Sequence, residues 1–179
     1  MIPFPEELLE TCSQYFLHKE LNMVKIFLHG LESSSRGAKA TFLRGQFPEM
    51  LIPDFRGSLP ERMKSLNTAL AGRRGIVLVG SSFGGLMATL YAMENPDTVE
   101  RLVLLAPALN FPDFSEYGIK QVSIPTRMII GRHDTITPAE LVLPVARRIF
   151  ADLTYDEVND DHMLAGTFRS LDWKSLLQE

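Results

Sequence analysis

The chain has 179 residues, and 45% of them are hydrophobic, so the composition supplies a packed core and excludes a disordered or low-complexity protein. Its 18 basic and 22 acidic side chains give a net charge of −4, which argues against nucleic acid or an anionic membrane as the main partner. The length suits one domain spanning residues 1–179, and the single cysteine, Cys12, excludes an internal disulfide and a thiolate metal cluster.

The N-terminal residues do not have the pattern of an export signal. Residues 1–7 lack a basic segment, and acidic residues precede any apolar run. No uninterrupted apolar stretch approaches the ~20 residues that cross a bilayer. We therefore expect a cytoplasmic protein without a membrane span, and we leave its oligomeric state open.

Apolar runs rich in β-formers alternate along the chain with segments of helical period. After a first helix predicted over 5–17, strands are predicted over 23–28, 50–53, 75–80, 102–105, 126–130 and 153–158. Helices are predicted over 36–46, 60–71, 83–94, 138–149 and 164–177, and the proline-containing segment 106–125 is predicted to be an irregular loop. Continuous apolar runs are typical of strands covered by helices on both faces. The sequence predicts an α/β three-layer sandwich with a mostly parallel sheet of about six strands.

A nucleophile motif follows the most apolar of these strands. Gly80-Ser81-Ser82-Phe83-Gly84 fits Gly-x-Ser-x-Gly between a strand and a helix, as a nucleophile elbow requires. The register favours Ser82 over Ser81, because choosing Ser81 would put Val79 and Phe83 at the positions that must be small. The alternative is a turn serine that caps the helix.

A serine nucleophile needs a base and an orienting acid, and both occur after later strands. Of the four histidines, His162 is the predicted base, because it lies in a loop between the last strand and the final helix. Asp134 follows the strand at 126–130 and is the predicted acid, with Asp113 in reserve. A surface-loop histidine and a turn aspartate are the alternative interpretations.

The order Ser82, Asp134, His162 resembles that of the α/β-hydrolase superfamily. His29-Gly30-Leu31 resembles its oxyanion loop, and Asp54-Phe55-Arg56-Gly57 resembles a segment after the next strand. The resemblance covers about residues 24–177 and is to small, uncapped bacterial serine esterases and thioesterases. It implies an oxyanion hole formed by the backbone N–H groups of Leu31 and Phe83. Two departures from the family pattern predict a reduced fold without a lid domain: only about 22 residues precede the first strand, and only 52 positions separate Ser82 from Asp134.

The resulting hypothesis is a serine hydrolase that cleaves a carboxylic ester or thioester, a small-molecule substrate, through an acyl-enzyme on Ser82. It needs no cofactor and no metal, since the histidines lack zinc-ligand spacing and no phosphate-binding glycine loop occurs. One alternative is a non-catalytic binding protein that keeps the fold. Another is acyl-transfer or carbon–carbon hydrolase chemistry on the same triad.

Two groups of residues bear on the substrate. The aromatic side chains of the 106–125 loop could line an acyl pocket or could equally pack the loop onto the body: Phe111, Phe114 and Tyr117. The basic residues that flank the front of the predicted sheet could bind an anionic group such as that of a coenzyme A thioester, or could form a solvated helix face: Arg36, Lys39, Arg44 and Arg56.

Overall fold

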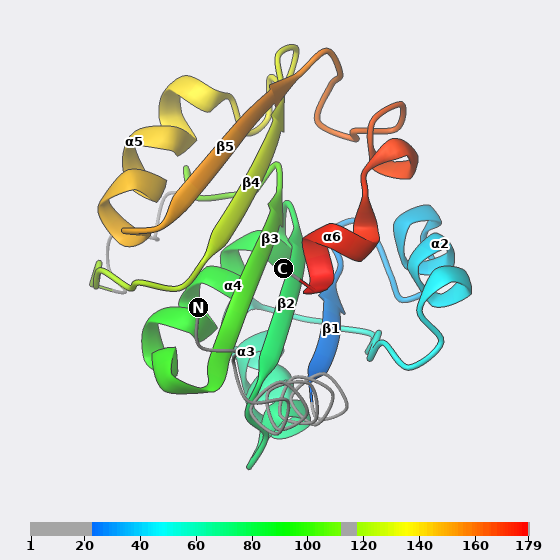
Figure 1. Cartoon of the computed structure of the whole chain (residues 1–179), viewed down its shortest axis with the longest axis vertical. Coiled ribbons are helices and arrows are strands. Elements are labelled where there is room, and N and C mark those ends of the chain that lie inside the picture. Colours follow the sequence, from blue (N-terminus) through cyan, green and yellow to red (C-terminus); the bar gives the residue numbers. More distant parts are fainter. Residues whose placement is uncertain (1–22, 112–117, 179) are drawn as a thin grey trace, which may run out of the picture.

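A parallel five-stranded sheet forms the middle layer of the computed structural model, which describes residues 23–111 and 118–178. The strands run in the spatial order in which they occur along the chain, and Figure 1 shows their carboxyl ends at one edge. They are β1 (Val24–Leu28), β2 (Ile76–Ser81), β3 (Val99–Leu105), β4 (Thr126–Gly131) and β5 (Leu153–Val158). The mostly parallel α/β sheet is therefore confirmed. The helix expected over 5–17 lies outside the described residues.

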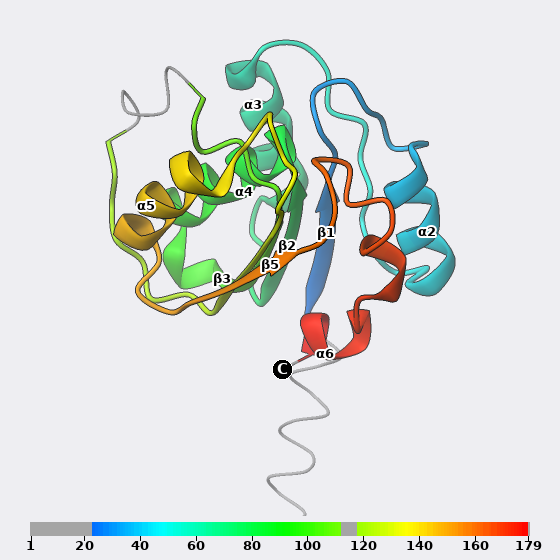
Figure 2. The same ribbon diagram turned by 90° about the horizontal axis from the view of Figure 1, so that it is seen from above.

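Helices cover both faces of the sheet, as the unbroken apolar strands predicted. Figures 1 and 2 show α3 (Leu59–Leu70), α4 (Phe83–Glu94) and α5 (Ala139–Ile149) on one face, with α2 (Ala38–Gln46) and α6 (Trp173–Gln178) on the other. Successive strand residues point to opposite faces. Ile26 and Leu28 belong to the core under α3–α5, and Phe27 belongs to the core under α2 and α6. The three-layer sandwich follows from this alternation.

The sheet has one strand fewer than expected. In the run 50–53, Leu51 alone forms an isolated parallel bridge with Ile26 at the outer side of β1. Its N–H donates to Lys25 and its carbonyl accepts from Phe27. Pro53 has no N–H, so it cannot donate the next hydrogen bond of a ladder, and the pairing ends after one residue.

The helix predicted over 164–177 is wrong over its first half. Leu164 has a φ of +49°, a short 3₁₀ turn occupies Phe168–Ser170, and α6 begins only at Trp173. Asp172 starts that helix, because its carboxylate accepts a hydrogen bond from the Ser175 N–H at 3.2 Å. The apolar period of the segment instead reflects Leu164 and Phe168, which a mostly exposed loop packs onto the core under α2 and α6. In the 106–125 segment, the described parts (106–111 and 118–125) contain no helix, as expected.

The connections around β1 and β2 create a crevice at the carboxyl ends of these strands. The chain leaves β1 for α2 on one face and leaves β2 for α4 on the other face (Figure 2). Neighbouring strands whose connections diverge in this way leave a space between their ends, and open α/β sheets bind ligands there. The fold thus points to the loops after β1 and β2 as the place of the site.

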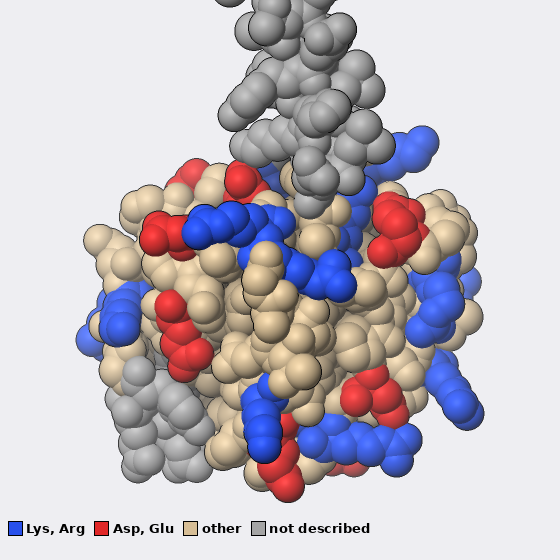
Figure 3. All heavy atoms as spheres, turned by 90° about the horizontal axis from the view of Figure 1, so that it is seen from below, with Lys and Arg blue, Asp and Glu red and all other residues tan. Residues whose placement is uncertain are grey.

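The opposite edge of the molecule carries mixed charge. Figure 3 looks at the amino ends of the strands and shows both basic and acidic side chains on that face. Within residues 23–111 and 118–178, no helix has the length and apolar character needed to cross a bilayer.

Candidate active site

Ser82 occupies a strained turn between β2 and α4. Its φ is +53° and its ψ is −115°, a conformation that non-glycine residues rarely adopt. The turn is fixed on both sides, because the Ser82 N–H donates to the Leu105 carbonyl at 2.9 Å and the Ser82 carbonyl accepts from Ala108 at 3.0 Å. Ser82 itself is partly exposed, whereas its neighbour Ser81 is buried.

Close backbone packing makes this turn possible. A Cβ on Gly84 would overlap the carbonyl of Leu28 in β1, and a Cβ on Gly80 would meet the Gly84 carbonyl at 2.5 Å. Glycine is therefore required at both positions for α4 to approach the sheet. These are the two small positions of the Gly-x-Ser-x-Gly motif.

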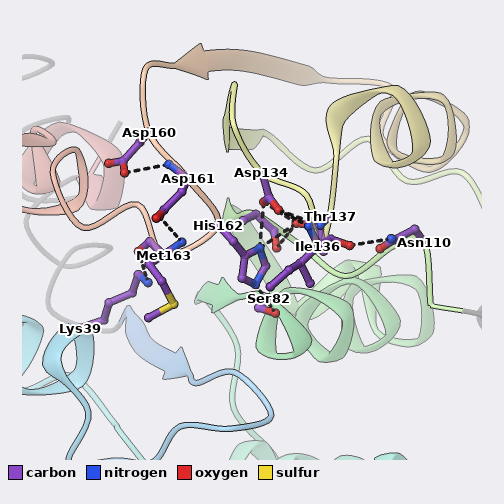
Figure 4. Close-up of polar contacts among 11 residues, drawn as sticks. Lys39, Ser82, Asn110, Asp134, Ile136, Thr137, Asp160, Asp161, His162 and Met163 are labelled. Carbon is purple, nitrogen blue, oxygen red and sulfur yellow. Dashed lines mark hydrogen bonds and ion pairs between the residues drawn. The ribbon is translucent and has the colours of Figure 1, made fainter.

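His162 joins the serine to Asp134 (Figure 4). Its Nε2 lies 3.0 Å from Ser82 Oγ, and its Nδ1 lies 2.8 Å from Asp134 Oδ2. The three residues come from the loops after β2, β4 and β5, so the sheet brings together positions that are up to 80 residues apart. The order and identity of the contacts are those of a nucleophile, a base and an orienting acid.

Asp134 is held as a carboxylate. It is only 4% exposed, and burial alone would raise its pKa. Hydrogen bonds from the Thr137 N–H (2.8 Å), His162, the Thr137 hydroxyl and the Ile136 N–H (2.9 Å) outweigh that burial and lower the pKa. An ionised Asp134 accepts the Nδ1 proton of His162, which leaves the Nε2 lone pair facing the serine hydroxyl.

Thr137 is a site residue that sequence reasoning missed. Its hydroxyl lies 2.7 Å from Asp134 Oδ2, 3.2 Å from His162 Nδ1 and 3.1 Å from the Ala106 carbonyl. The spacing could have indicated this role, because the carboxylate of a turn aspartate accepts hydrogen bonds from the residues that follow it, and Thr137 lies three residues after Asp134.

The loop that carries His162 is held by polar side chains. Asp160 Oδ2 accepts from the Thr167 N–H at 2.8 Å and so closes the loop around the histidine. Desolvation alone would raise the pKa of Asp160, but hydrogen bonds led by those from the Thr167 and Asp161 N–H groups lower it. From α2, Lys39 Nζ donates to the Met163 carbonyl at 2.6 Å (Figure 4). Burial lowers the pKa of Lys39, opposed by the charges of Asp160 and Asp161.

The loop after β1 passes beside the serine. The position of a Cβ on Gly30 lies 3.5 Å from Ser82 Cβ and 4.0 Å from Ser82 Oγ. His29 is buried and shapes this loop, because its Nε2 accepts from the Phe55 N–H at 2.9 Å and its Nδ1 therefore donates to the Gly30 carbonyl at 2.8 Å. Neither the Leu31 nor the Phe83 N–H donates to another group among the described residues.

The remaining predicted residues lie in different surroundings. Phe111 packs edge-to-face against Phe83, with ring centroids 5.6 Å apart. Asp113, Phe114 and Tyr117 lie outside the described residues. Of the basic group, Arg44 donates to the Ser35 carbonyl at 2.8 Å, Arg56 pairs with Asp54 at 2.8 Å, and Arg36 is exposed. In the described part of the chain, no three His, Cys, Asp or Glu side chains are grouped to hold a metal.

The comparisons with known proteins agree with this architecture. The family model of the α/β hydrolase fold matches residues 29–123, which is more than half of the chain, so the protein belongs to the α/β hydrolase fold family. No curated protein sequence is similar enough to count as a match.

Solved structures share the fold at low identity. A candidate hydrolase from Agrobacterium vitis is 18% identical with a TM-score of 0.73, and 89% of each chain is covered. Mouse α/beta hydrolase domain-containing protein 10 is 20% identical over 79% of this chain and 82% of its own, with a TM-score of 0.67. A monoacylglycerol lipase from Paleococcus ferrophilus is 16% identical over 87% and 93%, with a TM-score of 0.65.

Proposed function

We propose that the protein is a serine hydrolase that cleaves carboxylic esters or thioesters through an acyl-enzyme on Ser82. The observation that carries this proposal is the position of the His162 ring, which lies 3.0 Å from Ser82 Oγ and 2.8 Å from Asp134 Oδ2. A non-catalytic member of the fold has no need for a strained serine, a matched histidine and a buried carboxylate in one chain of contacts.

The chemistry follows from these contacts. His162 Nε2 removes the hydroxyl proton as Ser82 Oγ attacks the substrate carbonyl, and Asp134 stabilises the imidazolium that forms. The Leu31 and Phe83 N–H groups bind the oxyanion of the tetrahedral intermediate. His162 then returns the proton to the leaving alcohol or thiol. A water molecule activated by His162 finally releases the acid and restores the serine.

The substrate class is an ester with an apolar acyl group of short or medium length. Four large apolar side chains are 47% to 61% exposed, and three of them adjoin the site: Leu31, Ile136 and Met163, with Leu141 on α5 as the fourth. Each buried methylene contributes about 0.8 kcal/mol, so kcat/KM should rise about fourfold per methylene until the pocket ends. Ile136→Ser should flatten this rise, whereas Leu141→Ser should leave it unchanged. Interfacial activation with long-chain triglycerides would contradict this assignment.

Labelling with a fluorophosphonate, followed by peptide mapping, tests the enzyme class. Wild-type protein should be labelled at Ser82 and should hydrolyse p-nitrophenyl acetate. Ser82→Ala should lose both properties, whereas the matched variant Ser81→Ala, in the adjacent buried position, should keep them. Absence of label on the folded wild-type protein would reject the proposal. Label at Ser82 without ester or thioester turnover would indicate acyl transfer or another bond type.

A further inference from the structure

Arg62 of α3 is a buried cation that the proposed mechanism does not use. Its side chain is 5% exposed, in a helix whose other buried residues are apolar. Arginine is almost never buried to this extent unless it is paired. Here it makes no ion pair within residues 23–111 and 118–178, so its place in the core needs another reason.

The guanidinium binds backbone carbonyls of two loops at the edge of the crevice. Its Nε donates to the Gly57 carbonyl at 3.0 Å, and its Nη2 donates to the Leu31 carbonyl at 3.3 Å. The second contact acts on the oxyanion loop, because fixing the Leu31 carbonyl restricts rotation of the residue whose N–H is proposed to bind the oxyanion. The side chain of Leu31 is exposed and supplies little anchorage of its own.

The same guanidinium lies over the ring of Phe83, with its Cζ 5.3 Å from the ring centroid. Nη1 is buried without a hydrogen-bond partner among the described residues, so the aromatic face compensates part of the lost hydration of the guanidinium. Phe83 is the other residue of the proposed oxyanion hole. One buried cation therefore contacts both Leu31 and Phe83, which come from different elements.

This arrangement costs stability, because a buried donor without a partner loses its hydration. Burial also lowers the pKa of Arg62, against the charges of Asp54 and Glu32. A leucine or methionine would fill the same place in the core without that cost. Local costs of this kind are characteristic of functional positions.

We propose that Arg62 is a positioning residue for the oxyanion hole: it fixes the Leu31 and Phe83 backbone relative to each other and places a positive charge behind them. The inference rests on the proposed serine hydrolase function. It concerns a transition-state interaction, so its effect should appear in kcat and leave ground-state binding unchanged.

The test compares Arg62→Met and Arg62→Lys with wild-type protein. For an ester substrate, Arg62→Met should lower kcat about 10-fold to 100-fold with little change in KM, somewhat less than the loss of an oxyanion donor itself. Arg62→Lys keeps the charge but not the two-pronged donor, so it should recover part of kcat. If Arg62→Met fails to fold, Arg62→Lys alone still carries the test, with a smaller decrease in kcat.

A trifluoromethyl ketone provides the readout that a merely structural role would not change. Ser82 Oγ adds to the ketone carbon, its proton passes to His162, and the former carbonyl oxygen becomes an oxyanion. Affinity for this inhibitor should fall by the same factor as kcat, while affinity for the corresponding non-fluorinated alcohol should stay constant.

Arg44→Met is the matched control, because Arg44 also donates from a guanidinium to a carbonyl of the loop after β1, that of Ser35. It should leave kcat and inhibitor affinity unchanged. The inference is overturned if folded Arg62 variants keep wild-type kcat, or if their loss affects KM and both ligands equally. A wild-type protein that neither hydrolyses esters nor reacts with fluorophosphonate would instead overturn the proposed function.

Discussion

The serine and the histidine of the site lie in segments that are held in place in different ways. Ser82 lies where a buried strand meets a buried helix, and its position is set by backbone contacts that only glycine permits. His162 lies in an irregular loop whose Asp160 and Asp161 carbonyls pack closely on Gly131. Two side-chain hydrogen bonds also hold this loop: the Asp160 carboxylate accepts one, and Lys39 donates the other. The nucleophile is thus fixed by backbone packing in the core, whereas the loop of the base depends in addition on polar side-chain contacts. Substitutions should therefore affect the two segments differently.

The largest effect is expected for Gly84→Ala. Its Cβ would overlap the Leu28 carbonyl, so β1 and α4 would have to separate, and overpacking against backbone should cost about 3 kcal/mol or more. Urea unfolding and soluble yield measure this loss, with activity falling in parallel.

Gly45→Ala near the end of α2 is the control for this glycine, because its Cβ meets nothing within 4 Å. It should stabilise the protein by about 0.5–1 kcal/mol. A Gly84→Ala protein of normal stability and activity would contradict the view that backbone packing fixes the elbow.

Asp134→Asn should give the largest effect on the catalytic step alone, and it should separate catalysis from folding. The amide removes the negative charge that orients and stabilises the His162 imidazolium, so kcat should fall about 10⁴-fold with the fold retained. Steady-state kinetics and circular dichroism check the two halves of the prediction. If Asp134→Asn retains near-normal kcat and Asp113→Asn abolishes it, the acid has been assigned to the wrong residue.

Asp160→Asn should destabilise the loop that carries His162, and the resulting loss in the free energy of unfolding should depend on pH. Because folding lowers the pKa of Asp160 below its ordinary value of 3.8, the carboxylate stabilises the protein fully above that value, and this contribution is lost as the pH falls through the folded-state pKa. We expect a loss of about 1 kcal/mol in the free energy of unfolding at neutral pH and a roughly 10-fold lower kcat.

The stability difference between wild type and Asp160→Asn should then shrink towards pH 3. Asp97→Asn changes an exposed carboxylate in the 3₁₀ turn Pro96–Thr98 before β3 and should change neither quantity. A difference that stays constant down to pH 3 would show that the carboxylate charge does not hold the loop.

The same contrast explains how much could be predicted from the sequence. The strands, most helices and the mutual positions of Ser82, Asp134 and His162 follow from continuous apolar runs and from the rule that parallel sheets place function at their carboxyl ends. The short pairing at Leu51 and the broken 164–177 segment were misjudged, since both depend on which backbone groups find partners in the fold.

Polar contacts across distant segments were the main omission. Lys39 was weighed as an anion-binding residue, yet its ammonium lies on the Met163 carbonyl, 124 positions away in sequence. The sequence gives no sign that Arg62 is buried, because a basic residue in a helix is usually solvated. Hydrophobic period predicts which face of a helix is buried, but it carries no information about the partner of a buried polar group.

Lys39→Met should have the smallest of these effects, and it distinguishes the two roles considered for this residue. Methionine keeps an apolar stem against Phe168, over which Lys39 Nζ lies at 5.7 Å, but it loses the hydrogen bond to Met163. If Lys39 holds the histidine loop, kcat for p-nitrophenyl acetate should fall about threefold to 10-fold, as loss of one partly solvated hydrogen bond allows, with KM unchanged. If it instead binds an anionic leaving group, KM should rise for a coenzyme A thioester alone, and the small neutral ester should be hydrolysed normally. Lys25→Met, which removes an ion pair to the exposed Glu49, should affect neither substrate. Kinetics on both substrates with both variants would decide between the roles.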